Sequence, residues 1–225
     1  MSRNQLIIVV VAVLVIAGAV FAYYYMPSGT SSQAAIPETT GASSYAVATD
    51  DHALGSPKAP ITIIEYAAPT CPHCAHFNQE TFPLVKTNYI DTGKVYYVFR
   101  VFPLHPSDGA VEAMATCLPK DGYFQFIDLM FRNQPKWDWE YGVSDIHGAL
   151  VQMGRIAGLS PEQVDKCIGN KAVLDHVNKV AQDGQTKYSI SGTPTFIING
   201  GVHASGDVGT YADMQKVLDG LLAKK

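Results

Sequence analysis

Two of the four cysteines stand three positions apart, in the segment Cys71-Pro72-His73-Cys74. The segment follows a β-branched run at residues 61–66 and opens a stretch with helical spacing, so we expect it at a helix N-terminus with Pro72 in the first turn. Unpaired N–H groups and the positive end of the helix dipole stabilise a thiolate at such a position. The pattern predicts thiol–disulfide exchange, in which Cys71 is the exposed nucleophile, Cys74 resolves the mixed disulfide and His73 adds positive charge beside Cys71.

A zinc site is the alternative interpretation of this segment. Cys71 and Cys74 could supply half of one, with His76 as an additional ligand. Structural zinc takes four ligands, whereas the other cysteines, Cys117 and Cys167, each stand alone far along the chain. The sequence therefore favours a redox pair, and we expect neither a metal nor a cofactor.

The composition excludes several classes of protein. Hydrophobic residues make up 47% of the chain and charged residues 16%, which is typical of a globular protein and not of a disordered one. With 16 basic and 20 acidic residues the net charge is −4, so nucleic acid is not expected as a partner. Four cysteines are too few for a disulfide scaffold, and a folded core must come from apolar burial.

The N-terminal segment determines the expected compartment. Residues 6–26 form an apolar run of 21 residues, which is long enough to cross a bilayer as a helix. Arg3 precedes the run and the next basic residue is Lys58, so we expect the body of the protein outside the cytoplasm. A cleaved signal peptide is the alternative, because residues 20–22 could form a cleavage site. Either reading predicts a periplasmic protein, tethered to the inner membrane or released, in a compartment that permits disulfides.

The sequence predicts an α/β domain behind this segment. A cytoplasmic stub at residues 1–5 and the anchor or signal at 6–26 are followed by a linker at 27–47, rich in Gly, Pro, Ser and Thr. The folded domain is expected over residues 48–225. Its expected elements are a strand at 61–66, a helix at 71–89, a strand at 94–102, helices at 108–118, 122–132, 144–157, 161–168 and 172–188, a hairpin at 195–205 and a helix at 210–222.

From residue 51 onward the chain resembles the DsbA-like branch of the thioredoxin superfamily, particularly its exported bacterial disulfide oxidoreductases. The resemblance is carried by Ala59-Pro60, Glu65-Tyr66, Cys71-Pro72-His73-Cys74, Phe99-Arg100, Phe102-Pro103-Leu104 and Gly192-Thr193-Pro194-Thr195-Phe196. It implies a thioredoxin-like α/β fold with an inserted all-helical domain at about 104–188, here preceded by the predicted N-terminal transmembrane helix.

The resemblance also implies roles for residues outside the cysteine pair. Thr193 and Pro194 match the cis-proline loop that faces the cysteines, where an extended substrate can pair with the Thr193 backbone. Glu65 matches a buried acid that takes the proton from Cys74, and its place on the apolar face of its strand predicts a raised pKa. An ordinary trans proline and a rim acid paired with a lysine are the alternatives.

The remaining cysteines, Cys117 and Cys167, fall in two different predicted helices of the insertion. In an exported protein they are expected to pair, and some DsbA-like proteins carry a second, structural disulfide in this domain. Two buried small hydrophobes are the alternative. The aromatic group at residues 137–141 is expected to fill the interface between helices.

The activity implied by the resemblance is that of an oxidase. Such a protein donates its Cys71–Cys74 disulfide to exported proteins that carry cysteine thiols, and a DsbB-like membrane quinone reductase reoxidises it. Contact with the membrane is expected through residues 6–26 only. Threonine before the proline, here Thr193, is common among reductases and isomerases, so a disulfide isomerase or reductase is one alternative. A thiol-dependent chaperone without enzymatic activity is the other.

Overall fold

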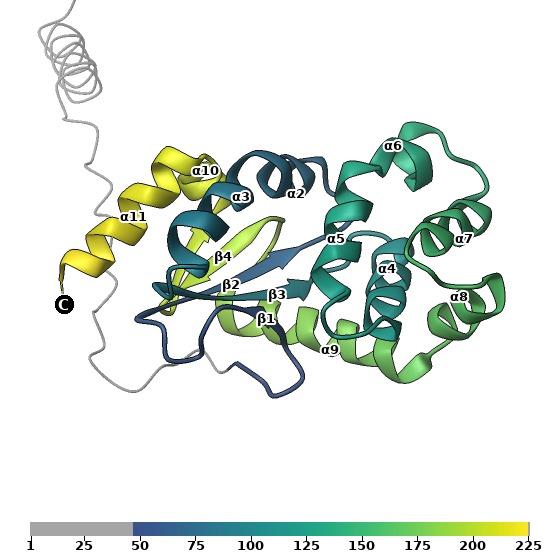
Figure 1. The fold of residues 1–225 in the computed structure, drawn as a ribbon, viewed down its shortest axis with the longest axis horizontal. Coiled ribbons are helices and arrows are strands. Elements are labelled where there is room, and N and C mark those ends of the chain that lie inside the picture. Colours follow the sequence, from purple (N-terminus) through teal and green to yellow (C-terminus); the bar gives the residue numbers. More distant parts are fainter. Residues whose placement is uncertain (1–46, 225) are drawn as a thin grey trace, which may run out of the picture. The chain divides into compact units, whose positions relative to one another are not determined.

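A mixed five-stranded sheet lies at the centre of the protein, whose computed structural model describes residues 47–224 (Figure 1). The strands, in spatial order, are β1 (His52–Leu54), β3 (Val95–Val101), β2 (Ile61–Ala67), β4 (Thr195–Ile198) and β5 (Gly201–Ala204). β2 and β3 run parallel, and the other pairs are antiparallel. The predicted anchor or signal at residues 6–26 lies outside the described residues. Within residues 47–224, no helix is both long and apolar enough to cross a membrane.

The central strand β2 is buried on both faces, as its β-branched sequence predicts. Ile61 and Ile63 belong to the larger hydrophobic core, whereas Ile64 and Tyr66 belong to a second cluster. Side chains alternate between the two faces of a strand. Glu65 therefore lies on the face of the larger core, the same core that contains the two cysteines of the redox motif.

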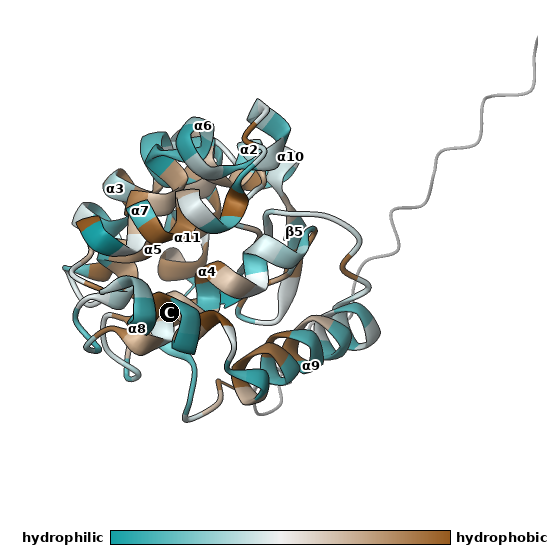
Figure 2. Ribbon diagram, turned by 90° about the vertical axis from the view of Figure 1, so that its right-hand side faces the viewer, coloured by the Kyte–Doolittle hydropathy of each residue, from teal (hydrophilic) through white to brown (hydrophobic). Residues whose placement is uncertain are grey.

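Helices cover both faces of the sheet (Figure 1). On one face lie α2 (Pro72–His76), α3 (Phe82–Val85) and α11 (Tyr211–Ala223), and α11 contacts both α3 and β2. The long helix α9 (Lys171–Tyr188) lies against the other face, where it contacts β3. Helix α9 carries both hydrophobic and hydrophilic residues along its length (Figure 2). Its hydrophobic residues Val180 and Ala181 pack against the cluster on this face of the sheet.

An all-helical segment is inserted between β3 and β4, as predicted. Its further helices are α4 (Pro106–Cys117), α5 (Tyr123–Arg132), α6 (Gln134–Trp137), α7 (Ile146–Ile156) and α8 (Pro161–Ile168). The short helix α6 was not predicted; Pro135 stands in its first turn, where the missing N–H costs nothing. Two further short elements, β1 and α10 (Ser205–Val208), were not predicted.

The helix predicted over residues 71–89 is present but is not regular. α2 and α3 are joined by a π-helical turn at Phe77–Thr81, and a second π turn at Lys86–Ile90 follows α3. In the first turn the Phe82 N–H donates to the Phe77 carbonyl, five residues back. Pro83 comes next, and in a regular helix its ring would clash with a carbonyl of the preceding turn. The wider turn relieves that clash.

The aromatic group of the insertion divides between core and surface. Trp137 is fully buried, and its Nε1 donates to the Met130 carbonyl at 2.8 Å. Trp139 and Tyr141 are about half exposed, although Trp139 stacks on His105 with ring centroids 5.2 Å apart. Only Trp137 fills the interface between helices as expected.

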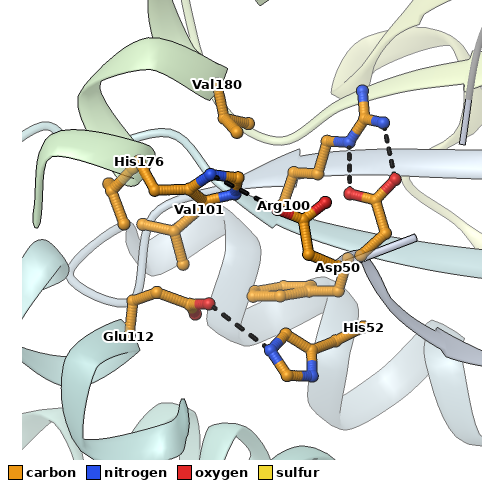
Figure 3. A pocket seen from close by; sticks show the side chains of 10 residues that line it. Asp50, His52, Arg100, Val101, Glu112, His176 and Val180 are labelled. Carbon is orange, nitrogen blue, oxygen red and sulfur yellow. Dashed lines mark hydrogen bonds and ion pairs between the residues drawn. The ribbon is translucent and has the colours of Figure 1, made fainter. Parts of the chain in front are cut away.

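A hydrogen-bonded cluster joins the sheet to the insertion where β1, β3, α4 and α9 meet. Glu112 of α4 and His52 of β1 face one another there, with Nε2 and Oε1 3.9 Å apart (Figure 3). The Tyr123 hydroxyl donates to Glu112 at 2.6 Å, and the His52 ring stacks on Tyr123. Burial raises the pKa of Glu112 to about 7 and lowers the pKa of His52. This carboxyl is therefore buried without carrying a full charge near neutral pH.

A disulfide joins Cys117, at the end of α4, to Cys167 in α8, with the Cα atoms 6.1 Å apart. The two residues are separated by 50 positions in the sequence. The bond therefore closes a long loop within the helical insertion, away from the elements that carry the cysteine motif.

Replacing both Cys117 and Cys167 with serine should lower the free energy of unfolding by about 4 kcal/mol, because the unfolded chain regains the entropy of a loop of this length. Chemical denaturation without reductant measures the loss. The exchange activity of the folded variant should stay within about twofold of the parent. Ready alkylation of both residues in the native, unreduced protein would contradict the expectation.

Candidate active site

The two cysteines of the motif lie at the start of α2. Cys71 is the N-cap residue in an extended conformation, with φ −73° and ψ 121°, and Pro72 follows in the first turn, as predicted. Both thiols are free. Cys74 is fully buried and Cys71 is only 6% exposed. The expectation of an exposed Cys71 is therefore wrong. In its thiol form the Cys71 Sγ donates to the Thr193 carbonyl at 3.4 Å, so a distant loop covers it.

The two thiols differ strongly in acidity. A hydrogen bond from the Cys74 side chain is the main cause that lowers the pKa of Cys71 to about 6, and backbone N–H groups of Cys74 and His73 add to it against the cost of burial. Burial raises the pKa of Cys74 well above its ordinary value, and its hydrogen bond to Cys71 adds to the rise. Near neutral pH the pair therefore holds a thiolate at Cys71 and a thiol at Cys74.

His73 acts on Cys71 differently from the sequence-based expectation. Its side chain is exposed, and its contribution to the lowered pKa of Cys71 comes from the backbone N–H. His73 thus contributes through its backbone at the helix N-terminus, and this contribution is smaller than that of the Cys74 side chain.

Glu65 lies beneath the cysteines on β2. It is 2% exposed and accepts a short hydrogen bond from the Tyr97 hydroxyl. Burial raises the pKa of Glu65 to about 8, with a further contribution from Cys71, while the bond from Tyr97 opposes the rise. Glu65 in turn raises the pKa of Cys74. A rim acid paired with a lysine is thereby excluded, and the carboxyl is poised to hold or accept a proton near neutral pH.

The loop before β4 faces the cysteines. The Thr193–Pro194 peptide bond is cis, and the Thr193 carbonyl is the acceptor for Cys71 Sγ. Thr195, at the start of β4, pairs with Tyr66 of β2. The pairing of β4 with β2 thus places residues 193–194 beside the end of β2 from which the cysteine loop leaves.

Three residues that contact the site were not predicted, namely Tyr97, Asp108 and Gln134. Tyr97 holds Glu65, and Asp108 and Gln134 contact the backbone immediately before Cys71. An acid two residues after Pro106 is a signal for a helix N-terminus, but its contact with Thr70 spans 38 positions. Spacing along the chain gives no sign of such a contact.

No cluster of three or more potential metal ligands occurs in residues 47–224.

Comparison with known proteins agrees with this geometry. A family profile described as Thioredoxin matches residues 48–220. The crystal structure of Wolbachia pipientis alpha-DsbA1 superposes with a TM-score of 0.71 at 30% identity, over 79% of this chain and 94% of that one. The chain belongs to the DsbA-like branch of the thioredoxin superfamily. The inserted helices of this DsbA-like chain are thus part of a shared fold.

Relatives of the DsbA-like chain are also found by sequence, among them the following two. A Rickettsia typhi protein named among the protein-disulfide oxidoreductases is 31% identical over 161 residues, which cover 69% of this chain and 57% of the relative. Disulfide bond formation protein D of Bacillus subtilis is 27% identical over 150 residues, covering 65% of this chain and 66% of that one. The DsbA-like chain therefore spans little more than half the length of the rickettsial relative.

Proposed function

We propose that the protein is a thiol:disulfide oxidoreductase that acts as an oxidase, donating a Cys71–Cys74 disulfide to proteins that carry cysteine thiols. The observation that carries the proposal is the split in acidity between the two thiols at the start of α2, where the pKa of Cys71 is lowered to about 6 and that of Cys74 is raised. A thiol of low pKa is a good leaving group, so a disulfide that contains its sulfur is readily reduced.

In the oxidising direction, a substrate thiolate attacks the Cys71 sulfur of the disulfide. The Cys71–Cys74 bond breaks, and Cys74 leaves with the electron pair and takes a proton, for which Glu65 is the nearby source. A second substrate thiolate then attacks the substrate sulfur of the mixed disulfide, and Cys71 leaves as a thiolate. The substrate gains a disulfide and the protein gains two electrons.

Reoxidation reverses the roles of these groups. The Cys71 thiolate attacks a disulfide of the oxidising partner and forms a mixed disulfide. Cys74 must then lose its proton before it can attack the Cys71 sulfur. Glu65, with its pKa raised to about 8, is the proton acceptor in this step. A DsbB-like membrane quinone reductase would supply the disulfide.

Exported proteins are the proposed substrates, and the periplasm is the proposed compartment. The apolar segment at residues 6–26 supports export. The second disulfide, Cys117–Cys167, also fits a compartment outside the reducing cytosol. An extended substrate segment would pair with the backbone at Thr193, next to Pro194.

The direction of exchange is tested by comparing the stability of the two redox forms. Thiolate stabilisation in the folded reduced form should make that form melt at the higher temperature. The pKa of Cys71 falls from 9.0 to about 6 on folding, so at this group the unfolded chain binds more protons between these values. The contribution of Cys71 to the stability of the reduced form, which the oxidised form lacks, therefore rises with pH. The difference in Tm between the two forms should therefore widen from pH 6 to pH 8.

A disulfide isomerase or reductase is the second candidate, favoured by Thr193 before the cis proline. It requires the opposite order of stability, with the oxidised protein melting at the higher temperature. That outcome would overturn the proposed direction and leave the exchange chemistry of Cys71 intact.

A further inference from the structure

Two side chains of the helical insertion hold the backbone that leads into the redox motif. Gln134 of α6 is 2% exposed, and its Nε2 donates to the Pro69 carbonyl at 2.7 Å and to the Cys71 carbonyl at 3.1 Å. Asp108 of α4 is fully buried and accepts from the Thr70 backbone N–H at 2.7 Å and from its hydroxyl at 3.1 Å. Three consecutive residues are thus bound by the insertion.

The Asp108 side chain of α4 is itself fixed in place by further hydrogen bonds. The Asp108 carboxylate also accepts from the backbone N–H groups of Leu104 and His105, at 2.8 and 2.9 Å. The bond from the His105 N–H belongs to the capping box at the start of α4. A buried carboxylate with several donors has little freedom to move, so it can serve as a rigid support for Thr70.

The backbone at Cys71 must be placed accurately for its chemistry. Cys71 is the N-cap of α2 in an extended conformation, and the backbone N–H groups of His73 and Cys74 at this helix end contribute to lowering the pKa of its thiol. α2 provides no side-chain cap of its own here. The geometry of the sulfur therefore depends on what holds residues 69–71 from outside the helix.

We propose that Gln134 and Asp108 are positioning residues, through which the helical insertion fixes Cys71 at the N-terminus of α2 and so sets its reactivity. The inference deepens the proposed function and rests on it for its biological meaning. The helical insertion would thus affect the reactivity of Cys71 in addition to covering the sheet.

The test measures Cys71 itself. In the full chain, Gln134→Met removes both donors and keeps the length of the side chain. The rate of Cys71 alkylation by iodoacetamide, followed by peptide mass spectrometry across pH 4 to 9, should shift its midpoint upward by about one unit. That shift equals roughly tenfold less thiolate below the midpoint. Thr70→Val, which removes one bond to Asp108, should give a smaller shift in the same direction and decides the matter if Gln134→Met does not fold.

Gln79→Met is the matched control. The Gln79 side-chain amide also donates a hydrogen bond to the insertion, to the Phe131 carbonyl at 3.4 Å, and this bond does not involve residues 69–71. Its alkylation profile should overlay the parent. An unchanged profile in the folded Gln134 and Thr70 variants, or an equal shift in the Gln79 variant, would overturn the inference. Failure of the parent to exchange disulfides with glutathione would instead overturn the proposed function, since alkylation does not require exchange.

Discussion

Replacing Cys74 with serine should convert the protein into a trap for its redox partners. Backbone N–H groups of residues 73 and 74 still favour the Cys71 thiolate, and a serine hydroxyl can donate to it in place of the Cys74 thiol. Cys71 therefore still attacks a partner disulfide, but no second thiol is left to release the partner. A mixed disulfide through Cys71 should accumulate and be visible as a heavier species on non-reducing gels, lost on addition of dithiothreitol. Cys71→Ser should abolish exchange, because the remaining thiol is buried and has a raised pKa.

The paired cysteines of the insertion provide the control for this experiment. The double change Cys117→Ser and Cys167→Ser removes the same number of sulfur atoms as the motif contains, yet leaves Cys71 and Cys74 unchanged. This variant should neither trap partners nor lose exchange. Trapping by Cys71→Ser instead of Cys74→Ser would reverse the assigned roles of the two thiols.

Replacing Glu65 with glutamine should stabilise the reduced protein, increasingly so as the pH rises from 4.5 to about 8. Folding raises the pKa of this carboxyl from 4.5 to about 8, so within that interval the folded protein binds more protons than the unfolded chain. The contribution of Glu65 to the stability of the parent therefore falls as pH rises, by about 1.4 kcal/mol for each unit. Glutamine carries no such penalty. Denaturation at pH 4.5, 6 and 8 measures the widening difference between the two proteins.

The same change should slow the steps in which Cys74 loses its proton, since glutamine cannot accept one. A loss on the order of 100-fold in resolution of the mixed disulfide is expected for a positioned general base. Stopped-flow measurement of that step checks it. If resolution were as fast as in the parent, Glu65 would be a structural acid only.

Glu112→Gln separates the two effects of the Glu65 variant. Glu112 is also buried, also accepts a bond from a tyrosine hydroxyl, and also has a raised pKa, of about 7. Its carboxyl interacts with Tyr123 and His52 and not with the cysteine thiols. The variant should therefore share the pH-dependent gain in stability without any change in exchange.

Much of the site could be predicted from local sequence. The cysteine segment, a proline within it and a β-branched run before it are enough to place Cys71 at a helix N-terminus. Alternating burial placed Glu65 on the core face of β2. The turn at Asn199-Gly200, with φ values of 47° and 91°, follows from residues that tolerate positive φ.

The rest of the site depends on contacts between distant segments. The cover over Cys71 comes from Thr193, 122 positions away, and the bond from Gln134 to the Cys71 carbonyl spans 63 positions. Neither contact has a periodic pattern that reveals it. The strand β1 was missed for a related reason, since its three residues form an edge strand that depends on pairing with the distant strand β3.

The two π turns in the helix that follows the cysteines have a consequence for comparison among relatives. Each π turn contains one residue more than an α-helical turn, because its hydrogen bond spans five residues instead of four. A relative that lacks one residue within 77–81 or 86–90 can therefore close a regular turn there and keep the same side chains facing the sheet. Alignments of this family should accept single-residue gaps at these two places, although they lie inside a helix, where gaps are ordinarily penalised most.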